Sequence, residues 1–431
     1  MEQGLKRYRI ALLVGGCLLL VALAGPAQAV IVDRLYEAVV PVEDTGEDAR
    51  DEAFREAMRQ VLLRLTGNPG SVRQLVPPVS EGDDEDRPDG AIGERVARFI
   101  DAFSYRREDG ELALHATLSA SALGRELAER EVPVWGANRP RLLVWFVVDD
   151  QGERQLIHRE STLPPFLAEP MQPLDGPAIA AESGPWKEPL WAASRRRGLP
   201  VALPFHDERD RSRVSISEIW GLFPGPIRKG SARYEHDRMA VVRVNRLGGG
   251  WRARWHLWRA GSVVVDGTTR EDDRASVVDS LVDAWADRLA SNYAVALETG
   301  DGLRPARMLV SGVDSLTSYA AVRQSLAGLE PVRSVRVKGV NQDRLTLELA
   351  FNGKLPLLRD YIALEKRFEL MGGPPDGAIP TDGGSGDLVL YYRWAGEDDA
   401  AGRGQKDGEP LEIVPLESPE DESGGDATPL L

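Results

Sequence analysis

The residue types that most often perform catalysis or bind metals are sparse in this 431-residue chain. No two of its histidines stand four residues apart, the spacing that places two imidazoles on one helix face to hold a metal. The single cysteine is Cys17, and no serine stands in the Gly-x-Ser-x-Gly turn of a serine hydrolase. We therefore expect no metal site and no cofactor. The five histidines are His115, His158, His206, His236 and His256.

Acidic residues are numerous, so a pair of carboxylates could act as general acid and general base, and the sequence gives no distance between them. A hydrolase that uses such a pair is our alternative hypothesis. The polar segment His206–Asp210 contains residue types that bind metals, and we interpret it as a solvated turn. Asp314 or Ser315 stands where the N-cap of a helix is expected.

The segment 251–258 is our main candidate for binding a partner. Side chains alternate across a strand, so Trp251, Ala253, Trp255 and Leu257 are expected on a core face. The opposite face would then carry Arg252, Arg254, His256 and Trp258. Two guanidinium groups beside an indole would suit an acidic partner surface. The alternative is an ordinary exposed face whose arginines balance local acids.

The connecting segment 135–140 offers two further candidates, Trp135 and Arg139. A functional interpretation makes it a ligand-facing loop with Trp135 as a stacking platform. The structural interpretation, which we favour, makes Trp135 a packing residue. Likewise, Arg195, Arg196 and Arg197 are expected to complement the dipole at the end of a helix.

The N-terminus has the features of a secretory signal peptide. A basic start precedes the apolar run 10–25, and Ala27-Gln28-Ala29 matches the small-x-small pattern that signal peptidase cleaves. We expect cleavage after Ala29 and export from the cytoplasm; the family resemblance described below implies that the compartment is the periplasm. The alternative is a lipoprotein attached through Cys17.

Charge narrows the possible partners. The chain carries a formal charge of −15, and loss of a net +2 with residues 1–29 leaves the mature protein near −17. Such a protein is a poor ligand for nucleic acid or an anionic membrane. No second long apolar run follows the signal, so we expect no transmembrane anchor in the mature chain. The expected partners are other proteins of the cell envelope.

Hydrophobic periodicity predicts a mixed α/β or α+β protein of three small domains. The first spans 30–134, with a strand over 31–42, helices centred on Phe54–Leu65 and Ile92–Phe103, a strand over 112–119 and a closing helix. The helix around Phe54 is expected to begin at Asp44 or Thr45 and to stop at Gly67.

The second expected domain spans 140–300. It contains a buried strand, a helix that ends before Gly198, a hairpin around Gly248–Gly250 and a long closing helix. The third spans 304–394, and its β-α-β-β-α-β order is that of a ferredoxin-like fold. Residues 395–431 are strongly acidic and are expected to be disordered.

Several segments resemble the proteobacterial periplasmic family catalogued as domain of unknown function 2066. They are LYEAVVPV (35–42), REAMRQVLLRLTGN (55–68), VPVWGANRPRLLVWFVVDD (132–150), LVSGVDSLTSYAAV (309–322), PVRSVRVKGV (331–340) and YYRW (391–394). The resemblance implies a Gram-negative envelope and supplies no catalytic residues. We therefore expect a non-catalytic binding or scaffold factor.

Overall fold

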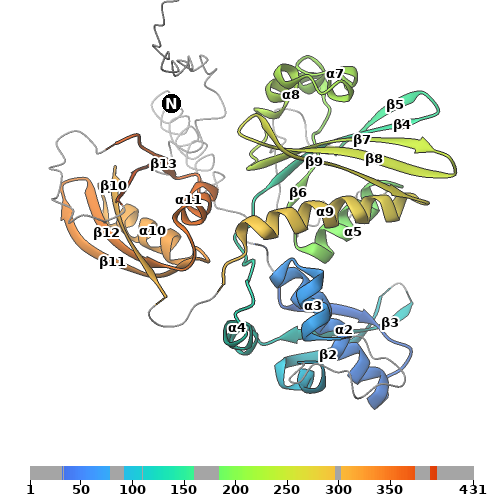
Figure 1. The fold of residues 1–431 in the computed structure, drawn as a ribbon, viewed down its shortest axis with the longest axis horizontal. Coiled ribbons are helices and arrows are strands. Elements are labelled where there is room, and N and C mark those ends of the chain that lie inside the picture. The colour runs from blue at the N-terminus through green and yellow to red at the C-terminus, as the bar shows by residue number, and fades with distance from the viewer. Residues whose placement is uncertain are drawn as a thin grey trace, which may run out of the picture.

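Three β-sheets, each packed against helices, surround the long helix α9 (Arg274–Tyr293) in Figure 1. This computed structural model describes residues 32, 34–77, 92–108, 110–159, 184–296, 302–373 and 389–395. The expectations for the signal peptide and for the acidic tail fall outside the described residues. The expected mixed α/β architecture is confirmed.

The N-terminal sheet is antiparallel, with the order β1-β3-β2. Its strands are β1 (Glu37–Pro41), β2 (Ile100–Glu108) and β3 (Glu111–Leu118). Helix α2 (Glu47–Thr66) covers one face, and it ends as expected at Gly67, whose φ of 62° lies in the left-handed region that glycine adopts readily. Its buried stripe is Ala53, Phe54, Ala57, Met58, Val61, Leu62 and Leu65. The remaining helices of this region are α3 (Pro69–Leu75), the 3₁₀ helix η1 (Ile92–Phe99) and α4 (Ala120–Glu129).

Two expectations for this region are wrong. Helix α2 has Gly46 as its N-cap, and Asp44 instead accepts a hydrogen bond from the Gly46 backbone N–H at 2.7 Å. The second expected helix stops at Phe99, and the chain continues as β2, which places Phe103 in a strand. The cause is tertiary, because pairing with β3 satisfies the backbone of residues 100–108 better than a further helical turn.

The middle sheet has the order β5-β4-β7-β8-β9, with β6 beside β4. Its strands are β4 (Leu142–Asp150), β5 (Glu153–Ile157), β6 (Val201–Ala202), β7 (Arg238–Leu247), β8 (Gly250–Arg259) and β9 (Ser262–Glu271). Strand β4 runs parallel to β6 and β7 and is buried on both faces, so the expected buried strand is confirmed. The hairpin β7-β8 is also confirmed, whereas the edge strand β9 was not expected.

Helices cover this middle sheet unequally. Helices α5 (Lys187–Arg197) and α9 pack together on one side of the sheet, and α7 (Ile216–Trp220) and α8 (Pro224–Ser231) lie on the other (Figure 1). The short helix α6 (Glu208–Arg211) precedes α7. The side that carries α7 and α8 is covered at one end only, where a separate apolar cluster includes Ile227 and Trp258.

The C-terminal sheet has the order β11-β12-β10-β14-β13. Its elements are β10 (Arg304–Ser311), α10 (Leu316–Ala327), β11 (Val332–Asn341), β12 (Arg344–Phe351), α11 (Leu355–Leu364), β13 (Phe368–Leu370) and β14 (Val389–Trp394). The expected elements are present, and Ser315 caps α10 by accepting the Ser318 N–H at 3.1 Å. Strand β13 is additional, and β14 lies between it and β10, parallel to β10.

The middle and C-terminal sheets share one apolar core. A single cluster of buried residues continues from the α9 stripe into the C-terminal sheet. At this boundary Tyr361 Oη donates a hydrogen bond to the Tyr293 carbonyl at 2.8 Å, and Val134 forms a bridge with Val295. Among the residues described, no helix combines the length and apolar character needed to cross a membrane.

Candidate binding sites

The strand register brings together arginines of β7, β8 and β9 on the open side of the middle sheet. Arg243 on β7 lies opposite Arg254 on β8, and two residues away on β8, Arg252 lies opposite Arg270 on β9. Residues two positions apart on a strand share a face, as do residues directly opposite each other on neighbouring strands, so all four side chains project from the same side. We call Arg243, Arg252, Arg254 and Arg270 the arginine face. Arg254 and Arg270 are exposed, and Arg243 and Arg252 are partly buried.

Two carboxylates share this side of the sheet: Asp266 lies opposite His256, and Asp149, which pairs with Arg154, lies in the same row as Arg252 and Arg270. Within the described part of the chain none of its arginines forms an ion pair; Arg252 binds the Asn245 side-chain oxygen at 3.2 Å and Arg243 binds the Trp220 carbonyl at 3.0 Å. Burial lowers the pKa of His256 on the same face, Arg243 lowers it further, and only Asp266 opposes the shift. The imidazole is therefore neutral at pH 7, and the arginines supply the charge.

The four β8 residues expected in the core are buried there, whereas one residue of the predicted partner surface is not exposed. Trp251, Ala253, Trp255 and Leu257 are buried in the core beneath α9. Trp258 is also buried, with 4% of its surface exposed, because α8 covers that end of the sheet. The structure therefore removes Trp258 from the predicted partner surface.

Trp135 and Arg139 are buried as well, so neither can meet a partner at the surface. The Arg139 guanidinium stacks 4.1 Å from the centre of the Trp135 ring. It donates hydrogen bonds to backbone carbonyls of segments far apart in sequence, including Arg64 at 2.5 Å and Gly198 at 2.9 Å. Burial lowers the pKa of Arg139 to about 9. The ligand-facing interpretation of this segment is thus wrong, and the residues join the N-terminal region to α5.

Arg197 also connects the N-terminal region with α5. It does not remain at the solvated end of α5 with Arg195 and Arg196 but turns inward, where 1% of its side chain is exposed. Its guanidinium binds Asp283 at 3.0 Å and Asp287 at 2.6 Å on α9, and donates to the Gly67 carbonyl at 2.9 Å. We call Arg139 and Arg197 the arginine junction.

The segment His206–Asp210, expected to be a solvated turn, instead forms a network of hydrogen bonds that includes a buried carboxylate. Asp207 caps α6, and the fully buried Asp210 accepts hydrogen bonds from Tyr234 Oη and the His206 N–H. One guanidinium nitrogen of Arg233 contacts both carboxylates, at 2.7 and 3.2 Å. Burial opposes ionisation of Asp207, but hydrogen bonds from Arg233 and the Asp210 backbone N–H lower its pKa.

Asp207 and Asp210 form a carboxylate pair, as the hydrolase hypothesis requires, but the chemistry of this pair does not suit that role. A general acid needs a raised pKa, whereas Asp207 has a lowered one. Both carboxylates have structural roles, because Arg233 binds them both and Asp207 also caps α6. In the part of the chain that the structure describes, no three His, Cys, Asp or Glu residues are grouped to hold a metal ion.

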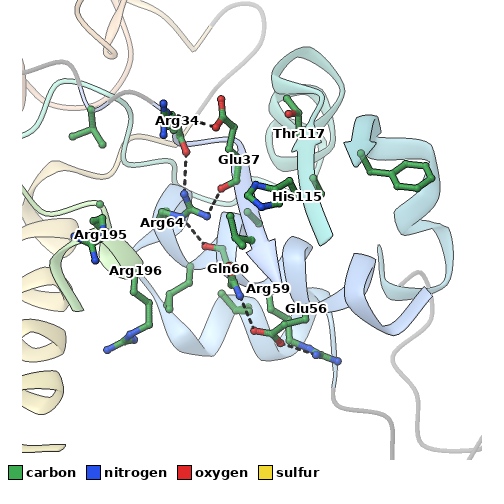
Figure 2. Close-up of a pocket in the computed structure, with 18 of the residues that line it drawn as sticks. Arg34, Glu37, Glu56, Arg59, Gln60, Arg64, His115, Thr117, Arg195 and Arg196 are labelled. Atoms are coloured by element: carbon green, nitrogen blue, oxygen red, sulfur yellow. Dashed lines mark hydrogen bonds and ion pairs between the residues drawn. The ribbon is translucent and has the colours of Figure 1, made fainter. Parts of the chain in front are cut away.

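A groove of about 1210 Å³ lies in the N-terminal region, between α2, the strands β1, β2 and β3, and the end of α5. Figure 2 shows arginines reaching it from the segment before β1, from α2 and from α5. Glu37 and Glu56 are the acidic residues among those that line it. Its seven arginines are Arg34, Arg59, Arg64, Arg73, Arg106, Arg195 and Arg196. We call this feature the arginine groove.

Contacts along the groove hold several of these side chains in place. Arg64 donates to the carbonyls of Arg34 at 2.9 Å, Glu37 at 2.5 Å and Gln60 at 3.3 Å (Figure 2). Burial lowers its pKa to about 10, so it remains charged at neutral pH. Sequence reasoning missed the groove because its arginines are spread over residues 34–196 and form no local motif.

Comparison with known proteins corrects the family assignment. Residues 29–81 match the model of a domain of unknown function (DUF8605), and not the family expected from the sequence. No curated protein matches the chain. The matched segment contains β1, α2 and α3, and it supplies more than half of the residues that line the arginine groove.

Proposed function

We propose that this protein is an exported envelope factor that binds other proteins without catalysing a reaction. The observation that carries the proposal is the arginine face: four guanidinium groups, in two cross-strand pairs on one face of a sheet, on a chain whose formal charge is −15. A guanidinium binds a carboxylate through two parallel hydrogen bonds, so a cluster of them suits the acidic surface of a folded partner.

The proposal includes compartment and domain organisation. We infer cleavage after Ala29 and residence in the periplasm from the apolar run and the Ala27-Gln28-Ala29 pattern. We further infer three domains, at 30–134, 140–300 and 304–394. The last would be a ferredoxin-like variant in which β13 and β14 form a hairpin after α11.

Crosslinking from the arginine face tests the proposal. A photoreactive residue at Thr268, which is exposed on this face, should capture a partner in cells, and the same residue at the exposed Ser291 of α9 should not. Adding Arg252→Ser and Arg254→Ser should abolish the capture from position 268. These surface changes should alter the free energy of unfolding by only about 0.5 kcal/mol.

The matched control is Arg209→Ser with Arg288→Ser, which removes the same charge from exposed positions elsewhere. Capture that survives the Arg252/Arg254 change, or is lost equally in the control, would refute docking on the arginine face.

A further inference from the structure

The arginine groove is lined mainly by positively charged side chains, although the protein as a whole is negatively charged. Its lining carries seven arginines against two glutamates, whereas the whole chain has 53 basic and 68 acidic side chains. A concave surface lined by one sign of charge concentrates the field and attracts ligands of the opposite sign. The ligand that this groove favours is therefore an anion.

The groove's arginines divide into two sets. In the first set Arg34 pairs with Glu37, Arg59 with Glu52 and Glu56, and Arg196 with Asp279 and Asp283, while backbone carbonyls hold Arg64. By contrast, Arg73, Arg106 and Arg195 form no ion pair with any described residue. They come from α3, β2 and α5, so three separate elements each present to the groove a guanidinium that pairs with none of the described carboxylates.

The shape and the apolar part of the lining favour a polypeptide. The volume of about 1210 Å³ exceeds the roughly 300–1,000 Å³ of pockets for small ligands. Val39 and Phe103, which also line the groove, expose 42% and 48% of their surfaces. Apolar side chains beside guanidinium groups match a chain that carries both acidic and apolar residues better than they match a phosphate group alone.

We propose that the arginine groove binds an extended acidic segment of a partner polypeptide. Its carboxylates contact Arg73, Arg106 and Arg195, and its apolar side chains cover Val39 and Phe103. This site is separate from the arginine face, which lies on another sheet and suits a folded surface.

Fluorescence anisotropy with the full mature chain tests this proposal. The probe is a labelled synthetic peptide of glutamates with interspersed leucines. The variant Arg73→Ser/Arg106→Ser/Arg195→Ser should bind it at least about tenfold more weakly, as expected for loss of several charged contacts. Arg195→Glu alone should also weaken binding, since it reverses one charge at the end of α5.

The matched control is Arg125→Ser/Arg209→Ser/Arg288→Ser, three exposed arginines that do not line the groove. It changes the net charge equally and should leave the affinity within about twofold. Equal weakening in both triple variants would overturn the proposal, because it would show attraction to charge in general. So would binding to phosphatidylglycerol vesicles without binding to the peptide.

A third arm separates the two sites. Arg252→Ser/Arg254→Ser should leave peptide affinity unchanged, even if it abolishes docking on the arginine face. If this variant alone lost peptide binding, the peptide would bind on the arginine face and not in the groove.

Discussion

His256 shows how a single side chain on the arginine face links pH to stability. Burial and Arg243 hold its pKa below the usual 6.5, and its Nδ1 has no hydrogen-bond partner among the described residues. Arg254 stands beside Arg243, and Asp266 is the one acid opposite His256 on β9. The folded state therefore resists protonation, whereas the unfolded chain takes up a proton near pH 6.5.

It follows that stability should fall as pH drops below about 6.5 and the unfolded chain binds more protons than the folded one. Replacing His256 with Gln should reduce this loss while leaving stability at pH 7 similar. Melting temperatures of both proteins, measured between about pH 7 and pH 5, would show it. Identical acid-side slopes for the two proteins would mean that other groups control the effect.

At the scale of elements, the end of α2 is the most constrained point of the N-terminal region. Gly67 has a φ of 62°, and a Cβ added there would overlap Ala290 of α9. Gly67→Ala therefore combines left-handed strain of about 1 kcal/mol with a steric clash, and we expect a loss of about 2 kcal/mol or more in the free energy of unfolding.

Gly110→Ala is the control for this substitution. Its φ of 94° imposes a comparable backbone strain, but no atom lies within 4 Å of the added Cβ. Urea denaturation of both variants should show a clearly larger loss at Gly67. Similar losses would mean that Ala290 moves away from the added methyl group without a cost in free energy.

Local signals account for the elements that sequence reasoning predicted well. Helix α2 has a full apolar stripe and a glycine stop, and β4 is an unbroken apolar run. Two of the missed strands lack such signals: β9 is an exposed edge strand, and β13 has three residues. Their pairing depends on partners distant in sequence, which local periodicity does not reveal.

The residues of the candidate sites were likewise predictable where a local pattern indicates them, and not where tertiary contacts place them. Alternation along β8 correctly brought Arg252, Arg254 and His256 to one face, since that pattern is local. It did not reveal Arg243 and Arg270, which join them through strand register, or the helix that buries Trp258. The burial of Arg139 was equally hidden, because its partners are carbonyls rather than recognisable side chains.

At the scale of the molecule, the arginine junction should make unfolding cooperative. Arg139 and Arg197 together bind the end of α2, the end of α5 and α9. We expect calorimetry to show one transition for the N-terminal and middle regions. Arg139→Met leaves several buried carbonyls unpaired, so it should cost about 3 kcal/mol or more and separate that transition into two.

Arg196→Met is the comparison for this variant, because Arg196 is adjacent to the junction but 35% exposed and bound only to surface carboxylates. It should cost less than about 1 kcal/mol and preserve the single transition. Two transitions in the unaltered protein would show that the regions unfold independently.

The hydrogen bond from Arg197 to the Gly67 carbonyl joins positions 130 residues apart. A polypeptide that leaves the ribosome N-terminus first can form α2 early, yet the end of that helix stays unsatisfied until α5 has been synthesised. Contacts across such separations also form slowly. Under the export that we propose, this delay would keep the chain unfolded while it passes through a translocation pore. The junction would thus help set when the protein folds as well as how stable it becomes.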